Sequence, residues 1–292
     1  MFSCRSAGDR TQLVRINCGM LKDVLTKRIF EVLPPDVTEI RLRRGGPLVY
    51  LTQTQKILTS YYVTNEEFEE ELSMVTEHSL YAITEKMVNG YIPLKGGIRV
   101  GVAGEGVMDG ERVKTVKNVT SLVLRIPHQV FGIADFLRID GKFDNNLLII
   151  SPPGAGKTTL LREVARQLSE RGKTVVILDE RGEISGATGT RFALTVGKNT
   201  DVLFGFPKRM AYDNALRALS PEYIVTDELS GEQDVLGVLR AYYGGVRVAA
   251  TLHGKDEMVF RGVFEPLREV FDHIVILSKE PTVGTLKKEI KR

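Results

Sequence analysis

The 292-residue sequence contains no tryptophan and only 2 cysteines, Cys4 and Cys18. The cysteines do not have the spacing of metal ligands, and such a pair does not make a disulfide scaffold, so a reducing environment is favoured. No stretch approaches the ~20 apolar residues of a membrane-spanning helix, and the polar start of the chain has no signal-peptide core. We therefore expect a cytoplasmic protein that associates with a membrane only through a partner.

Excess charge of one sign is also lacking. The sequence has 40 basic and 37 acidic residues, which give a formal net charge of +3. This balance does not support a broad nucleic-acid-binding surface. The basic end of the chain, residues 287–292, is most simply a solvated terminus.

The first half of the sequence has the pattern of a small α+β domain. After residues 1–20, which we expect to be frayed, apolar residues at helical spacing predict a helix over 21–32. Alternating residues then predict strands at 39–43 and 48–51. We place this domain at residues 21–131.

Two local signals extend this pattern. Thr64 and Glu67 have the spacing of a capping box, which predicts the start of a helix, and a second helical stretch follows to about residue 88. Residues 96–126 are rich in Gly and Val, with Asp109-Gly110 as a turn signal, and predict an antiparallel hairpin. We expect residues 132–146 to be a linker into the next domain.

The most informative segment is Ser151-Pro-Pro-Gly-Ala-Gly-Lys-Thr158, which directly follows the apolar residues 147–150. A buried strand, a Gly-rich turn and an amphipathic helix in this order are typical of a phosphate-binding P-loop, although Ser151 stands where glycine is usual. In such a loop Lys157 neutralises phosphate oxygens, and the hydroxyl of Thr158 ligates Mg²⁺. No Asn-Lys-x-Asp motif for guanine is present, so we expect ATP and Mg²⁺. The predicted nucleotide-binding residues are Pro153, Gly154, Ala155, Gly156, Lys157, Thr158 and Thr159.

Beyond the loop, helical segments alternate with apolar strands at 174–178, 223–226 and 246–250. This alternation predicts a parallel sheet with crossover helices. The predicted fold class is α/β: a RecA-like P-loop NTPase core with a mainly parallel sheet over residues 147–292, preceded by the smaller α+β domain with its antiparallel sheet. We expect a hairpin near residues 281–290 to close the core.

Polar residues follow each of these strands. Asp227 and Glu228 end one, residues 179–183 follow another, and His253 follows the third. Because the carboxyl ends of parallel strands meet at one edge of a sheet, these side chains should gather near the loop. Either Asp227 or Glu228 can hold Mg²⁺ or polarise an attacking water, and His253 is placed to contact the γ-phosphate or that water. The predicted metal ligands are Thr158, Asp227 and Glu228.

The order of these motifs resembles the ATPases of type II and type IV secretion systems, with their Walker A loop, Asp box, Walker B segment and His box. The similarity is closer to the stage III sporulation protein AA family of endospore-forming bacteria, and it covers nearly the whole chain after about residue 20. It rests on Glu39–Arg43, Gly97–Gly104, Leu122–Ile126, Asp179–Ile184, Ser220–Glu228, Thr251–His253 and Ile274–Leu277.

The resemblance implies an ATP-hydrolysing motor of a secretion-like transenvelope complex used in endospore formation. It also implies a homo-oligomer, a hexameric ring, that works on an integral membrane protein of the same complex. The family's motifs fall on Glu180 and Glu183 in the acidic box, Glu228 in Walker B and His253 in the His box. Whether Glu180 or Glu228 is the catalytic base stays open at this point.

The same resemblance points to arginines in the amino-terminal domain. Secretion ATPases donate such residues to a nucleotide site, which implies a role for Arg99 and Arg125 in the same chain or in a neighbouring subunit. A guanidinium suits this role because its planar set of N–H donors and its positive charge stabilise the negative charge on a transferred phosphoryl group. The sequence departs from the secretion ATPases at Asp227, where those proteins usually carry Gly, and it has no cysteine metal module.

Two other functions compete with this hypothesis. One is a single-strand nucleic-acid-binding P-loop ATPase, but no nucleic-acid module is visible after the predicted hairpin, so a nucleic-acid partner is not expected. The other is a small-metabolite kinase, which is disfavoured because the core has no evident lid insertion and a whole extra domain precedes it.

Overall fold

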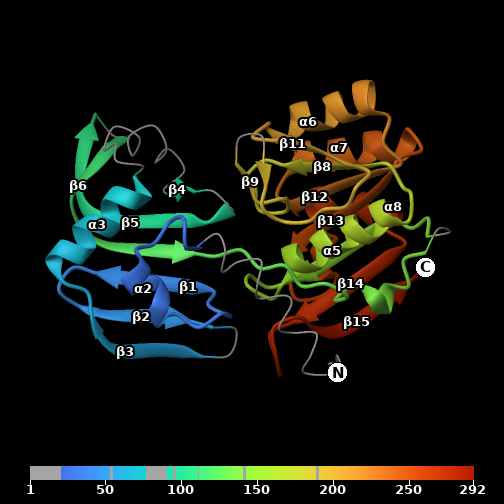
Figure 1. The fold of residues 1–292 in the computed structure, drawn as a ribbon. Coiled ribbons are helices and arrows are strands. Elements are labelled where there is room, and N and C mark those ends of the chain that lie inside the picture. The colour runs from blue at the N-terminus through green and yellow to red at the C-terminus, as the bar shows by residue number, and fades with distance from the viewer. Residues whose placement is uncertain are drawn as a thin grey trace. The chain divides into compact units, whose positions relative to one another are not determined.

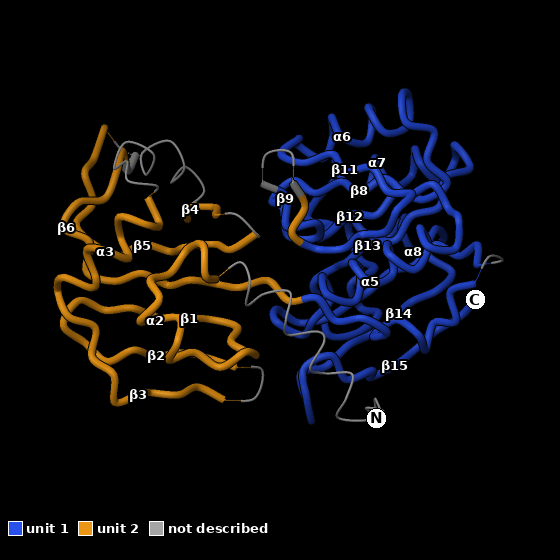
Figure 2. The backbone as a smooth tube through the Cα atoms, viewed as in Figure 1, with its two compact units in different colours: residues 1–5, 129–187, 194–292 blue, residues 6–128, 188–193 orange. Residues whose placement is uncertain are grey.

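The computed structural model describes residues 21–52, 55–76, 91–94, 97–110, 112–140, 143–188 and 191–292. The described chain divides into two compact units (Figure 2). The amino-terminal unit lies within residues 6–128 and includes residues 188–193, and the carboxyl-terminal unit comprises residues 129–187 and 194–292. The helical stretch expected up to about residue 88 lies largely outside the described residues.

The amino-terminal unit contains a six-stranded sheet in the order β3-β2-β1-β6-β5-β4 (Figure 1), and its paired strands run antiparallel. The predicted hairpin is confirmed, with its turn at Asp109-Gly110 and Gly110 at a φ of 61°. A positive φ favours glycine because it has no Cβ. The strands are β1 (Glu39–Arg43), β2 (Pro47–Leu51), β3 (Lys56–Tyr62), β4 (Ile92–Pro93), β5 (Arg99–Asp109) and β6 (Arg112–Arg125).

Two helices pack on this sheet, α2 (Lys27–Val32) and α3 (Asn65–Val75). The capping box of α3 is confirmed: Thr64 Oγ1 accepts from the Glu67 N–H at 3.1 Å, and Glu67 Oε2 accepts from the Thr64 N–H at 3.0 Å. The helix expected over 21–32 is wrong in its first part, because α2 begins only at Lys27. Thr26 is extended there, and its N–H donates to Glu71 Oε1 at 2.9 Å instead of continuing a helix.

The carboxyl-terminal unit is built on a seven-stranded sheet in the order β11-β8-β12-β13-β7-β14-β15. All neighbouring pairs are parallel except β14 with β15, so the mainly parallel sheet is confirmed. A hairpin closes the sheet, but its first strand lies at residues 273–278, before the residues 281–290 where the hairpin was expected. The strands are β7 (Leu147–Ser151), β8 (Val175–Asp179), β11 (Thr200–Phe204), β12 (Tyr223–Leu229), β13 (Arg247–His253), β14 (His273–Ser278) and β15 (Thr285–Lys291).

Both faces of this sheet are covered by helices (Figure 1). All five residues of β7 are buried: Leu147 and Ile149 pack on the side of α5 (Lys157–Glu170), whereas Leu148 and Ile150 pack on the side of α6 (Lys208–Asn214) and α7 (Glu232–Tyr243). A strand buried on both faces reads as a continuous apolar run, which is why this strand is evident in the sequence. The smaller elements of the described chain are η3 (Asp135–Leu137), β9 (Ala187–Thr188), β10 (Arg191–Phe192), η4 (Ala215–Leu219), η5 (Glu257–Val259), η6 (Gly262–Phe264) and α8 (Leu267–Val270), of which β10 belongs to the amino-terminal unit.

Two segments differ from the sequence-based expectation. The strand β11 was not predicted between β8 and α6. It lies at the sheet edge and is only partly buried, and its apolar residues are limited to Val202–Phe204, a shorter run than that of the buried strand β7. The segment 132–146, expected as a linker, buries Leu137, Ile139 and Phe143 in the core of the carboxyl-terminal unit. No helix in the described part of the chain is long and apolar enough to cross a membrane.

The hairpin of β14 and β15 carries a buried histidine that should make stability depend on pH. His273 is fully buried, with Nε2 at 2.8 Å from Glu289 Oε1, and its burial lowers its pKa. The unfolded chain, with a histidine pKa of about 6.5, then takes up a proton that the folded protein does not. The free energy of unfolding should therefore fall as the pH drops below this value, by at most about 1.4 kcal/mol per pH unit from this group.

Urea unfolding at pH 7.5 and pH 5.5 checks this prediction on the wild type and on His273→Gln. The variant should be less stable at pH 7.5 and should lose less of its stability on acidification. Equal losses in the two proteins would contradict a role for His273.

Candidate active site

The segment between β7 and α5 has the backbone of a phosphate-binding loop. Gly154 and Gly156 adopt φ values of 71° and 87°, which β-carbon-bearing residues rarely adopt. Ser151 is the last residue of β7 and is fully buried, and its Oγ donates to the Pro152 carbonyl at 3.0 Å. The position where P-loops usually carry glycine is thus part of the strand here, so serine fits it without strain.

Lys157 is the first residue of α5, and only 8% of its surface is exposed. Its Nζ lies 3.4 Å from His253 Nε2, at the end of β13. Because this contact is with an imidazole rather than a carboxylate, the ammonium charge is available to an anion in the loop. A buried charge is costly unless it is paired, so the site favours an anionic ligand.

Thr158 and Asp227 provide neighbouring oxygen atoms at the base of the loop. Thr158 Oγ1 donates to Asp227 Oδ2 at 2.6 Å, and Thr251 Oγ1 donates to the other carboxylate oxygen. Mg²⁺ takes oxygen ligands and is usually bound by one or two protein groups together with phosphates and water. The oxygen donors of Thr158 and Asp227 fit this requirement.

Glu228 has a strained backbone that its neighbours hold in place. Its φ is 52°, and the register of β12 against β13 shifts between Thr226 and Leu229. The Glu228 N–H donates to Thr251 Oγ1 at 2.7 Å, and its carbonyl accepts from Lys208 Nζ. A bulge of this kind changes the direction of a side chain. A left-handed backbone in a non-glycine residue lowers the stability of the fold by about 1–3 kcal/mol, so the neighbours of Glu228 must hold it in place.

The carboxylate of Glu228 lies between two cationic or protonatable groups. Its Oε1 is 3.2 Å from His253 Nε2, and its Oε2 is 3.6 Å from Arg181 Nη1. His253 therefore contacts both Lys157 and Glu228. The ends of β7, β12 and β13 thus meet as expected, and Lys157, Thr158, Asp227, Glu228 and His253 form one cluster.

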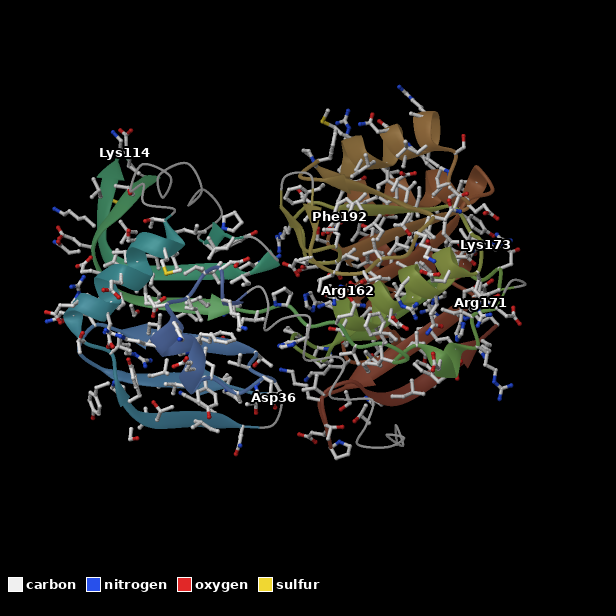
Figure 3. The ribbon with its side chains drawn as sticks, in the orientation of Figure 1. Asp36, Lys114, Arg162, Arg171, Lys173 and Phe192 are labelled. Carbon is white, nitrogen blue, oxygen red and sulfur yellow. The ribbon has the colours of Figure 1, made fainter. Side chains whose placement is uncertain are left out.

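The acidic segment after β8 is organised by Asp179 rather than by its glutamates. Asp179 is buried and accepts from the N–H groups of Glu183 and Ser185, both at 2.8 Å, and from Ser185 Oγ at 2.6 Å. Arg162, which extends from α5 (Figure 3), donates to the Glu183 carbonyl at 2.6 Å. Burial lowers the pKa of Arg162 to about 10, so its guanidinium stays charged at neutral pH. Glu180 is exposed and is not part of this network.

Arg99 and Arg125 lie in the amino-terminal unit, on β5 and β6. They are direct partners in the antiparallel register, and Arg125 is also paired with Glu39 of β1. Arg125 Nε lies 3.6 Å from Glu39 Oε2 with 73% of its side chain exposed, and the Arg99 guanidinium lies 5.0 Å from the centre of the Tyr91 ring. Opposed residues in such a pair project from the same face of a sheet, so the two guanidinium groups form one basic row.

Three residues of the site were not assigned a role from the sequence: Thr251, Arg181 and Lys208. Thr251 and Arg181 lie inside the Thr-Leu-His and Asp-Glu-Arg-Gly-Glu motifs, so the motifs marked their positions without indicating their partners. Lys208 had no sequence signal, because it lies 20 positions before Glu228 in a segment with no recognised motif. Its contact with the Glu228 carbonyl exists only in the folded chain.

The strand, loop and helix at the carboxyl end of a parallel sheet define a P-loop NTPase fold. Solved structures share this fold. The pilus retraction motor PilT with bound ADP matches with a TM-score of 0.59 and 15% identity, over 88% of this chain and 80% of PilT. The ATPase DotB of Yersinia pseudotuberculosis matches with a TM-score of 0.56 and 15% identity, over 85% of this chain and 73% of DotB.

The chain belongs to the family described as sporulation stage III, protein AA, whose model matches residues 7–291. Stage III sporulation protein AA of Bacillus subtilis (strain 168) is 33% identical over 263 residues, which cover 86% of this chain and 85% of that relative. The family resemblance found in the sequence is therefore confirmed.

Proposed function

We propose that the protein is an ATPase that drives a secretion-like transenvelope complex during endospore formation. The observation that carries this proposal is the convergence of Lys157, Thr158, Asp227, Glu228 and His253 at one edge of the sheet, through contacts of 2.6–3.4 Å. A cation, oxygen ligands for a metal and a carboxylate that can position water are groups that phosphoryl transfer to water uses. The imidazole of His253 contacts two of these residues, Lys157 and Glu228.

In this proposal residues 153–159 hold the phosphates of ATP. Their glycine backbone turns N–H groups toward the ligand, and Lys157 and the amino end of α5 add positive charge. Thr158 and Asp227 hold Mg²⁺, with Glu228 beside them. The metal supplies charge neutralisation on the phosphate oxygens.

Glu228 orients the attacking water and accepts its proton. Its bulged backbone is held by Thr251 and Lys208, and its carboxylate lies beside His253, which in turn contacts Lys157. His253 contacts both Lys157 and Glu228, so it is placed to contact the γ-phosphate or the attacking water. The exposed Glu180 is the second candidate for the base.

We further propose that the protein assembles as a homo-oligomer, a hexameric ring, and that Arg99 and Arg125 complete its nucleotide sites. The likeness in fold to a pilus retraction motor supports a motor function. The partner in this proposal is an integral membrane protein of the same complex, which holds the cytoplasmic ATPase at the membrane.

The test is nucleotide binding by a Lys157→Ala variant, measured with a fluorescent ATP analogue, together with ATP hydrolysis. Because a charged hydrogen bond is worth about 1.5–3 kcal/mol, we expect affinity to fall roughly 10- to 100-fold and turnover to be lost. Lys173→Ala is the matched control, since Lys173 follows the other end of α5 and pairs with Glu222 at 3.2 Å. Equal affinity of wild type and Lys157→Ala would refute the proposed phosphate site.

A further inference from the structure

The turn between β14 and β15 lies beside the phosphate loop because of the sheet topology. The strand β14 runs parallel to β7, with Ile276 paired to Ile150, so both strands end at the same edge of the sheet. The strand β15 returns antiparallel to β14. The connecting residues, 279–284, must therefore pass next to the segment that follows β7.

The turn contacts the two left-handed glycines of the loop. A β-carbon built on Gly154 would lie 3.4 Å from Lys279 Nζ and 3.5 Å from its Cε. One built on Gly156 would lie 3.7 Å from Val283 Cγ1 and 3.8 Å from the Gly284 Cα. The turn thus faces the phosphate loop at both of its glycines.

The turn is also anchored by its own hydrogen bonds. Thr285 donates to the Thr282 carbonyl from its N–H at 3.1 Å and from its Oγ1 at 2.7 Å, and the Glu280 N–H donates to Ser278 Oγ at 3.0 Å. These bonds fix the backbone of the turn. The flexible stem of Lys279 can then move its ammonium group without rearranging the turn.

Lys279 is exposed, and among the described residues no carboxylate forms an ion pair with it. The loop therefore has positively charged lysine groups at two places, with Lys157 at the start of α5 and Lys279 against Gly154. Two like charges near one loop are mutually unfavourable, and an anion between them relieves this repulsion. Nothing in the family motifs marks Lys279.

We propose that Lys279 is a second phosphate-binding lysine, supplied by the β14–β15 turn to the polyphosphate chain of the nucleotide in the P-loop. This inference rests on the proposed ATP-binding function and adds a residue to that site. The ammonium group binds the ligand as a point charge in water-exposed surroundings, so its contribution is smaller than that of the buried Lys157 and decreases with salt.

The experiment compares Lys279→Met, which keeps an unbranched apolar stem without the charge, and Lys279→Arg, which keeps the charge. Affinity for the fluorescent ATP analogue and displacement of that analogue by inorganic tripolyphosphate are measured at low and moderate salt. We expect Lys279→Met to weaken both ligands by roughly 3- to 10-fold at low salt, and Lys279→Arg to stay close to wild type. Tripolyphosphate has no base or sugar. Weaker binding of tripolyphosphate by Lys279→Met would therefore show that Lys279 acts on the phosphates of the nucleotide.

Lys287→Met is the matched control, because Lys287 lies on β15, is exposed and donates to the Lys255 carbonyl at 3.2 Å. It should bind both ligands as the wild type does. If Lys279→Met binds both ligands as the wild type does while Lys157→Ala loses binding, the role of Lys279 is refuted and the ATP site stands. If Lys157→Ala also binds normally, the proposed function and the inference built on it both fail.

Discussion

Replacing Glu228 by glutamine should lower the rate of ATP hydrolysis by roughly 10²- to 10⁴-fold while leaving ATP affinity nearly unchanged. The amide has the size of the carboxylate, but it cannot accept a proton from the attacking water. In the folded protein the carboxylate already lies 3.2 Å from His253, and its backbone is held by Thr251 and Lys208. The substitution therefore removes the base and keeps the geometry.

Single-turnover hydrolysis and equilibrium binding of ATP separate these two effects. Two further variants are measured alongside: Glu180→Gln, which tests the other candidate base, and Glu232→Gln, a surface control in the first turn of α7. We expect hydrolysis to survive in both. If Glu180→Gln stops hydrolysis and Glu228→Gln does not, the base is Glu180 and the arrangement around Glu228 is structural.

The second large effect is expected from the arginines of the amino-terminal unit. Arginines that are supplied to a phosphoryl-transfer site accelerate related reactions by about 10³-fold or more. Replacing Arg99 or Arg125 by alanine should therefore depress hydrolysis strongly and binding only slightly. A lysine at the same position should not restore the rate, because it lacks the planar fork of guanidinium.

Hydrolysis is measured across a range of protein concentrations, with molecular mass in solution determined in parallel. If the contact crosses subunits, activity per chain should rise with concentration in the wild type. Arg41→Ala is the matched control, since Arg41 also pairs with Glu39, at 2.6 Å, but is not predicted to reach the nucleotide. Wild-type rates in both alanine variants would show that this unit does not serve the nucleotide site.

The features that could be predicted from the sequence are those in which neighbours along the chain determine the structure. The buried run before Ser151, the glycines at 154 and 156, and the capping box at Thr64 each depend on a few adjacent residues. A prediction failed where a contact between residues far apart in the chain determines the local structure. The helix expected over 21–32 begins only at Lys27 because Thr26 bonds to Glu71, which is 45 positions away.

Within the site, the sequence by itself determined the chemical groups and the order of the strands that carry them. Parallel strands bring their carboxyl ends to one edge, so the gathering of Lys157, Asp227 and His253 could be deduced from the pattern. The tertiary structure alone decided which atoms meet. The contacts of Thr251 with Asp227, of Lys208 with the Glu228 carbonyl and of Lys279 with the loop join residues from separate elements. Such contacts depend on packing distances and on a bulge in β12, and no local spacing in the chain encodes either of them.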